Sequence, residues 1–139
     1  MKRIRFDDYD KDQEIPSLET GPIRQMDLVR YAGASGDFNP IHNDPEFARS
    51  VGLDGTIAHG MYVMSQIGWM CSNWVHPLQI KKFSVKFKGM VRPGDKIICK
   101  GRVKKKKEED GERLLFVDVD ALSETGEIRV SGELVVKCD

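Results

Sequence analysis

The sequence predicts an α+β fold in which an antiparallel sheet of five or six strands curls around one long apolar helix. Two patterns lead to this expectation. Residues 60–76 contain no Asp, Glu, Lys or Arg, and a helix that is apolar nearly all round belongs in an interior. After Pro77, apolar and polar residues alternate over several short runs, as they do in half-buried strands. A sheet and a helix of these kinds bury each other's apolar faces.

Length, charge and cysteine content limit the function classes. The 139 residues have the size of one domain, spanning 1–139. Lys plus Arg equals Asp plus Glu at 22 each, so net charge gives no reason to expect nucleic acid or a membrane surface as the main partner. The N-terminus turns acidic before any apolar run, so we expect no signal peptide and a cytoplasmic location. Cys71, Cys99 and Cys138 show no CxxC spacing and are expected to be reduced and structural.

The N-terminal part predicts a strand followed by a helix. Ile15–Ile23 carries the first apolar positions and two prolines, which indicates a short edge strand. Apolar residues then recur at roughly helical spacing over Ile23–Ala34 and predict a helix there. Gly33 and Gly36 mark the end of this helix.

Two further helices follow. Asp44 and Pro45 form a favourable N-cap and first-turn pair, which predicts a short helix over Glu46–Val51. Gly60–His76 is the long apolar helix. It is shorter than the ~20 predominantly apolar residues that span a bilayer, so we interpret it as a core helix and not as a membrane span.

The C-terminal half predicts an antiparallel meander, because turn signals at 93–95, 110–111 and 125–126 separate the alternating runs. The block 104–107 is four lysines followed at once by acidic residues, and we interpret it as a solvated hairpin tip, with contact to a phosphorylated substrate tail as the alternative. The positions expected to face the core are Phe83, Val85, Phe87, Ile97, Cys99, Val103, Leu115, Val117, Val119, Ala121, Ile128, Val130, Leu134 and Val136.

The loop between the first two helices concentrates side chains that can do chemistry. Asp37 and His42 are five positions apart, about 17 Å in an extended chain, so they share one proton network only if the backbone folds back. Pro40 bends the chain and pushes Asn39 out of the α region, which predicts an irregular loop over Gly36–His42. The plain alternative is an ordinary turn, since Asp and Asn beside Pro are common turn formers.

The motifs SGDFNPIHNDPEFA and TIAHGMYVMS resemble the hydratase motif of MaoC-like (R)-specific enoyl-CoA hydratases and (3R)-hydroxyacyl-ACP dehydratases. Within that family the stretch from Tyr31 to Met64 is most similar to the dyad-bearing subunit of mycobacterial-type fatty acid synthase II dehydratases. The resemblance implies a hot-dog fold whose short helical overhang carries the motif. It also implies that Asp37 and His42 are the catalytic pair and that Asn39 steadies them.

The resemblance further implies that Gly60 lends a backbone N–H to the thioester oxygen. Ala58, His59 and Met61 flank this position and are candidate substrate-binding or supporting residues, although we expect His59 to be mainly structural. Several relatives carry a serine on the core helix that touches the catalytic Asp. The matching position here is Gly68, and Ser65 is the candidate replacement.

The resemblance implies reversible hydration of 2-enoyl thioesters to (3R)-3-hydroxyacyl thioesters of CoA or acyl carrier protein, and the chemistry of these residues is suited to it. An Asp and a neutral His around one water supply a base and an acid. The first N–H groups of the core helix, with the helix dipole, meet charge on the thioester oxygen. The family implies a homodimer or higher oligomer, or a heterodimer with a sister subunit.

A thioesterase, a non-catalytic subunit and a metal site are the alternatives to hydration. Many hot-dog proteins are acyl-CoA thioesterases, and a partner-dependent subunit that only binds acyl chains is a further alternative. A metal site built from Asp37, His42, Asp44 and His59 lacks an i, i+4 pair of His or any similar ligand spacing. We therefore expect neither a metal nor a cofactor.

Overall fold

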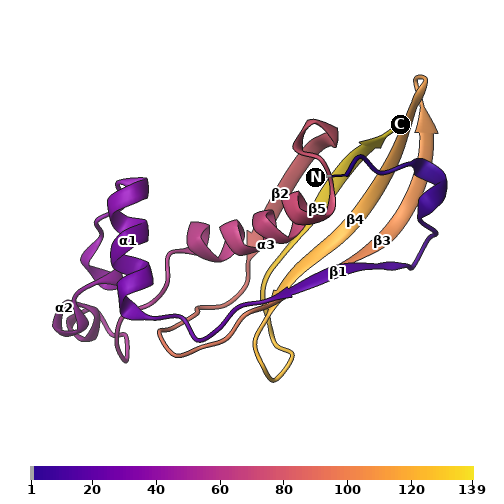
Figure 1. The fold of residues 1–139 in the computed structure, drawn as a ribbon. Coiled ribbons are helices and arrows are strands. Elements are labelled where there is room, and N and C mark those ends of the chain that lie inside the picture. Colours follow the sequence, from indigo (N-terminus) through magenta and orange to yellow (C-terminus); the bar gives the residue numbers. More distant parts are fainter. Residues whose placement is uncertain (1) are drawn as a thin grey trace.

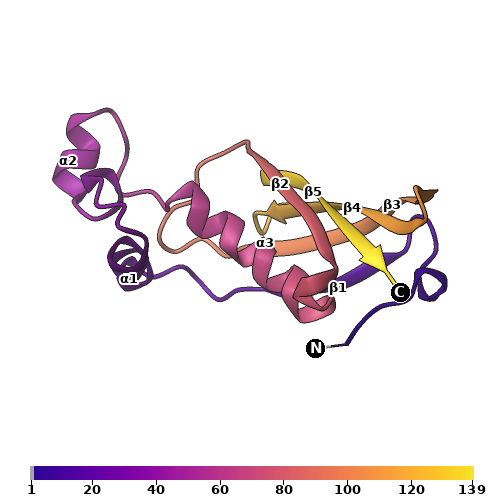
Figure 2. The same ribbon diagram turned by 90° about the horizontal axis from the view of Figure 1, so that it is seen from above.

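The computed structural model describes residues 2–139 and places the helices and strands along the chain as Figure 1 labels them. The main elements are β1 (Glu14–Glu19), α1 (Gln25–Ser35), α2 (Pro45–Ser50), α3 (Gly60–Trp74), β2 (Ile80–Phe87), β3 (Ile98–Glu109), β4 (Glu112–Leu122) and β5 (Ile128–Cys138). Three short 3-10 turns complete the elements: η1 (Phe6–Asp8), η2 (Pro40–His42) and η3 (Pro77–Gln79). The predicted α+β architecture is confirmed: one five-stranded sheet wraps around α3 (Figures 1 and 2).

The strand order of the sheet is β1-β3-β4-β5-β2. β3, β4 and β5 form the predicted meander, but the prediction is wrong for β2, which pairs with β5 and not with β3. A two- to five-residue turn forces neighbouring strands to pair, whereas residues 88–97 between β2 and β3 are long enough to reach the far edge. β1 lies at the other edge beside β3, as expected, and Pro16 falls within a break in its register.

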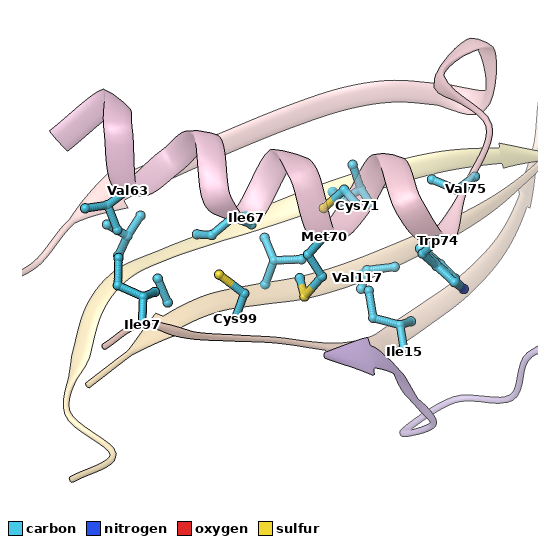
Figure 3. Packing of buried hydrophobic residues seen from close by; sticks show 14 of the residues in the cluster. Ile15, Val63, Ile67, Met70, Cys71, Trp74, Val75, Ile97, Cys99 and Val117 are labelled. Atoms are coloured by element: carbon cyan, nitrogen blue, oxygen red, sulfur yellow. The ribbon is translucent and has the colours of Figure 1, made fainter. Parts of the chain in front are cut away.

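The concave face of the sheet holds α3 (Figure 3). The buried side of the helix consists of Val63, Ile67, Met70, Cys71 and Trp74. These residues belong to one apolar cluster with the inward-facing residues of β1, β3, β4 and β5. Full burial of an aliphatic side chain such as Ile67 stabilises a fold by about 1.5–3 kcal/mol. The uncharged sequence of α3 is therefore explained by its position against the sheet.

Most of the alternating positions face the core as predicted, but two do not. Phe87 and Ile128 are 54% and 50% exposed. They lie at strand ends, Phe87 at the last position of β2 and Ile128 at the first position of β5. The three cysteines are free and buried, as expected, and burial raises the pKa of the Cys71 and Cys99 thiols to about 12.

The helices α1 and α2 stand apart from the sheet as an overhang next to the N-terminal end of α3 (Figures 1 and 2). Gly36 ends α1 in the left-handed conformation, and its N–H donates to the carbonyl of Ala32 at 2.9 Å. The Asp44 side chain accepts hydrogen bonds from the N–H groups of Glu46 and Phe47, which is the predicted cap of α2. The loop that carries Asp37 and His42 is thus fixed at both ends by helix caps.

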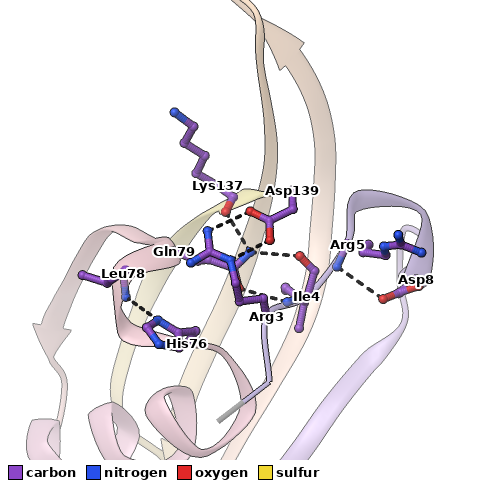
Figure 4. A network of polar contacts seen from close by, with 9 residues as sticks. All are labelled: Arg3, Ile4, Arg5, Asp8, His76, Leu78, Gln79, Lys137 and Asp139. Carbon is purple, nitrogen blue, oxygen red and sulfur yellow. Dashed lines mark hydrogen bonds and ion pairs between the residues drawn. The ribbon is translucent and has the colours of Figure 1, made fainter.

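The N-terminal segment is attached to the far end of the sheet (Figure 4). The buried side-chain amide of Gln79 donates to the carbonyl of Ile4 and accepts from its N–H, both at 2.9 Å. Arg3 and Asp139 form a two-bond ion pair beside this contact. His76 follows α3 and caps η3 by accepting from the N–H of Leu78.

Among residues 2–139, none of the helices combines the length and apolarity that crossing a bilayer requires.

The pairing of β2 with β5 depends on a glycine. A Cβ atom at Gly132 would overlap the carbonyl oxygen of Ser84 and lie 2.8 Å from Cγ1 of Val85. We expect Gly132→Ala to lower the free energy of unfolding by about 1–3 kcal/mol or more, since β2 must shift to relieve the overlap. Urea unfolding followed by circular dichroism measures this loss.

Gly68→Ala is the matched control. A Cβ atom there would meet Phe83 at an ordinary 3.5 Å, and replacing a glycine inside a helix by alanine stabilises it by roughly 0.5–1 kcal/mol. Equal effects of the two substitutions would contradict the tight contact at Gly132.

Candidate functional site

The loop between α1 and α2 brings Asp37 and His42 together as the sequence predicts. Gly36 turns the chain out of α1, and the N–H of Asn39 donates to Asp37 Oδ1 at 3.2 Å, which closes a small turn. Pro40 then begins the turn η2, which ends at His42. The result is a gap of 3.7 Å between Asp37 Oδ2 and His42 Nε2.

The imidazole of His42 is buried and has a defined orientation. Its Nδ1 lies 2.8 Å from the carbonyl oxygen of Ile57. A carbonyl only accepts, so Nδ1 carries the hydrogen of the neutral ring and Nε2 is left with a free lone pair facing Asp37. The side chain of Asp37 is 52% exposed. About half of this side chain is therefore open to solvent in the single chain.

His59, the residue directly before α3, contacts both of these residues. Its ring stacks on the His42 ring with centroids 3.7 Å apart and planes at 23°. Its Nε2 lies 3.1 Å from the main-chain carbonyl oxygen of Asp37 and must carry the hydrogen of that bond. Its Nδ1 is buried without a hydrogen-bond partner. Burial is the main cause that lowers the pKa of His59 below its usual 6.5, and the adjacent His42 adds to it.

The main chain of His42 is held by two residues that the sequence did not single out. Nε2 of Gln25, in the first turn of α1, donates to the His42 carbonyl at 2.7 Å. The hydroxyl of Thr56 donates to Oε1 of the same amide at 2.6 Å. Gln25 stands 17 positions before His42 in the sequence, so no local pattern connects them. The half-buried amide of Gln25 meets the His42 carbonyl and the Thr56 hydroxyl only because the fold brings these segments together.

The N-terminus of α3 opens into a pocket that also contains His42. The pocket has a volume of about 340 Å³. Apolar side chains make up most of its wall, and the lining is formed by His42, Ile57, Ala58, Gly60, Val63, Phe87, Lys88, Gly89, Met90, Val91 and Val130. The first N–H groups of an α-helix lack intrahelical partners and carry the positive end of the helix dipole. In α3 no side chain caps them.

Gly60 lies where a side chain would block this opening. A Cβ atom at this position would approach the Phe87 ring to 3.0 Å. Ala58, predicted as a supporting residue, lines the same pocket and its N–H donates to Val91 at 2.7 Å. Met61, also predicted as a supporting residue, is 55% exposed in the first turn of α3.

The other two predicted supporting residues act within their own segments. Oδ1 of Asn39 accepts from the N–H of Ile41 at 3.2 Å and caps η2, so this side chain shapes the loop between Asp37 and His42. The hydroxyl of Ser65 donates to the carbonyl of Tyr62 at 2.5 Å within α3. Ser65 therefore uses its donor inside the helix.

Three of the four residues considered as metal ligands lie together. One ligand atom from each of Asp37, His42 and His59 is within 4.8 Å of the other two, whereas Asp44 caps α2. A metal ion binds along the nitrogen lone pair, in the plane of the imidazole. One ion cannot lie in the planes of two rings that are stacked 3.7 Å apart. The stacking thus opposes joint coordination by the two histidines.

A larger hollow of about 490 Å³ lies on the opposite face of the sheet. Lys104 reaches toward Asp118 and Glu133 there, at 3.9 Å from each carboxylate. Burial and the neighbouring Asp118 raise the pKa of Asp120. The lining contains no His or Cys, so this hollow offers charge pairing and no acid–base pair of the kind found at His42.

The chain matches the family described as "MaoC like domain" over residues 9–125. The Arabidopsis thaliana mitochondrial 3-hydroxyacyl-[acyl-carrier-protein] dehydratase is 35% identical over 80 residues, which are 58% of this chain and 48% of that protein. A fatty acid synthase subunit beta of Gibberella zeae is 38% identical over 74 residues, 50% of this chain and 4% of the synthase. The chain therefore spans about half of the first relative and a small part of the second.

Solved structures share the fold. The (R)-hydratase from A. caviae involved in PHA biosynthesis is 25% identical with a TM-score of 0.80, covering 94% of this chain and 98% of that one. A MaoC-like dehydratase is 31% identical with a TM-score of 0.86, covering 97% of this chain and 42% of that one. The HadBC (3R-hydroxyacyl-ACP dehydratase) complex of Mycobacterium tuberculosis is 14% identical, covers 91% and 96%, and has a TM-score of 0.72, which shows the fold alone.

The hydrogen bonds of Gln25 to His42 and Thr56, together called the Gln25 brace, are expected to stabilise the fold. Gln25→Leu leaves the His42 carbonyl and the Thr56 hydroxyl without partners, and we expect a loss of about 1–3 kcal/mol in the free energy of unfolding. Thr56→Val should cost less, and the double variant should lose less than the sum, because both substitutions remove the same bond. Met26→Leu, at an exposed position of α1, is the control. Additive losses would contradict the brace.

His59 predicts acid sensitivity. Its lowered pKa means that the unfolded chain binds a proton at this residue more readily than the folded protein. The stability that the neutral ring contributes is thus present above pH 6.5 and is lost as the pH falls from 6.5 through the lower folded value. The difference in unfolding free energy between wild type and His59→Gln should shrink between pH 8 and pH 5 in urea titrations. His76→Gln should keep the wild-type acid loss; a constant difference for His59→Gln would contradict the prediction.

Proposed function

Because this chain belongs to the MaoC-like domain family, we propose that it adds water reversibly to 2-enoyl thioesters and gives (3R)-3-hydroxyacyl thioesters. One observation carries the proposal: His42 lies in one pocket with the uncapped N-terminus of α3, and Asp37 is 3.7 Å from its free nitrogen. These groups match the base, the acid and the carbonyl polariser that hydration requires.

The proton transfers fall to Asp37 and His42. A water between Asp37 Oδ2 and His42 Nε2 would be hydrogen bonded to both, because 3.7 Å is too long for a direct bond. One group of the pair removes a proton as the water oxygen bonds to C3 of the enoyl chain. The proton taken from the water is then passed through the other group to C2, so that the pair ends in its starting protonation state, and the reverse order of events eliminates water. Positioned acid–base groups of this kind contribute about 10²–10⁴ in rate.

The N–H of Gly60 is the proposed donor to the thioester oxygen. When water adds to C3, electron density from the double bond moves onto that oxygen before C2 is protonated. The positive end of α3 stabilises this charge, and loss of one such donor typically costs about 10² to 10³ in rate. The absence of a side chain at Gly60 leaves the approach beside Phe87 open. The apolar wall of the pocket, with Val63 and Met90, suits an acyl chain.

A second subunit completes the proposal. Strand β2 ends the sheet with one free edge, and unpaired strand edges are ready sites for pairing with another chain. Phe38, next to the half-exposed Asp37, is 68% exposed. Such exposure is unusual for a phenylalanine whose surface is not covered by another chain. We therefore propose a dimer, either of two copies or with a sister subunit, in which the open side of the site is covered. HadBC, which shares the fold, is a complex and supports this proposal.

The dyad is tested by two substitutions. Asp37→Asn and His42→Ala should each lower the rate of crotonyl-CoA hydration at least about a hundredfold, since each removes one proton-transfer group. Loss of the enoyl absorbance measures the rate, and circular dichroism checks that both variants are folded. Asp44→Asn, which changes a carboxylate in the same loop that only caps α2, is the control. Wild-type rates in both dyad variants would remove the assignment.

The products decide between this proposal and its alternatives. Chiral analysis should give the R alcohol, and an S alcohol would contradict the proposed geometry. Release of free CoA thiol without hydration would identify a thioesterase instead. The purified chain should be assayed alone against enoyl-CoAs of increasing length, because activity of the single chain would make a sister subunit unnecessary.

A further inference from the structure

We propose that His59 is a positioning residue that holds the two members of the dyad at their working distance. This inference rests on the proposed function, but its structural part is independent of any substrate. His59 belongs to the turn before α3, whereas Asp37 and His42 belong to the overhang loop. It therefore ties the loop that carries the acid–base pair to the helix that carries the proposed thioester donor.

The contacts of His59 reach both dyad residues through different parts of one ring. The face of the ring covers the imidazole of His42, with centroids 3.7 Å apart. The edge of the ring donates from Nε2 to the main-chain carbonyl of Asp37 at 3.1 Å. Tyr31 of α1 packs against His59 from another direction, with centroids 4.8 Å apart and planes at 62°. The ring is only 1% exposed, so these neighbours fix it in place.

The chemistry of this position favours a histidine over a residue that simply fills space. An apolar side chain would avoid leaving Nδ1 buried without a partner, an arrangement that destabilises the folded protein. Phenylalanine would keep the stack on His42 but could not donate to Asp37. Glutamine would keep a donor but could not stack. Only an aromatic donor with its N–H at the ring edge makes both contacts from this site.

The two histidines adopt opposite tautomers as a consequence. His42 holds its hydrogen on Nδ1, toward Ile57, and His59 holds its hydrogen on Nε2, toward Asp37. With the His59 ring covering one face of His42, rotation of the His42 ring is blocked and its Nε2 stays directed at Asp37 Oδ2. A displacement of about 1 Å in such an arrangement can lower a rate by about 10².

The test compares His59→Phe with His59→Gln, each of which keeps one of the two contacts. We expect kcat for crotonyl-CoA hydration to fall about 10- to 100-fold in each, with KM changed less than threefold, because the acyl pocket does not include His59. His76→Gln, at the other end of α3, is the control and should keep the wild-type kcat. Assays are run at low temperature after thermal unfolding has shown that each variant is folded.

A measurement without substrate accompanies the kinetics. Long-range proton–nitrogen NMR spectra of the imidazoles should show the Nδ1–H tautomer of His42 in the wild type and in His59→Phe, which keeps the stack, and a mixture of tautomers in His59→Gln, which loses it. Unchanged kcat together with an unchanged His42 tautomer in His59→Gln would overturn the positioning role. If the wild type does not hydrate enoyl-CoA but the tautomer still changes, the proposed function fails and the positioning role stands.

Discussion

The burial of α3 against the concave face of the sheet is the constraint on which the rest of the structure depends. Residues such as Ile67 and Met70 are almost completely buried, so the helix cannot shift along the sheet without opening a cavity. Truncating a buried side chain of this size costs about 2–5 kcal/mol of folding free energy. This packing fixes the N-terminus of α3 at one end of the sheet. The pocket with His42 and Gly60 lies there, so the core determines where polar chemistry becomes possible.

The overhang adds what the helix and sheet lack. Neither α3 nor the inner face of the strands carries a carboxylate or an imidazole near Gly60, and the loop over Gly36–His42 supplies one of each. Most of the loop is exposed to solvent. Its shape comes from helix caps and turns at its ends and from hydrogen bonds of His42 to Ile57 and Gln25. A polar loop held by such bonds keeps its side chains at the surface of the pocket, where a substrate can reach them.

The exposure of the site in a single chain agrees with a function that needs a second surface. Asp37 is half exposed and Phe38 more so, while His42 and His59 beneath them are buried. The imidazole pair is covered by protein on one side only. A partner subunit or an acyl substrate that excludes water from the other side would strengthen the charge interactions of the site, since these grow as the surroundings become less polar. The free edge of β2 offers one route for such a partner.

The sequence by itself determined the local features. The uncharged stretch became α3, the alternating runs became strands, Asp44 capped α2 and Pro40 bent the loop, because each of these depends on neighbouring residues and on a period of 2 or 3.6. Only the tertiary structure decided which strand β2 joins, that Gln25 holds the carbonyl of His42, and that His59 stacks on the His42 ring. These contacts join residues that are far apart in the chain, and their geometry follows from how the whole core packs and not from any local pattern.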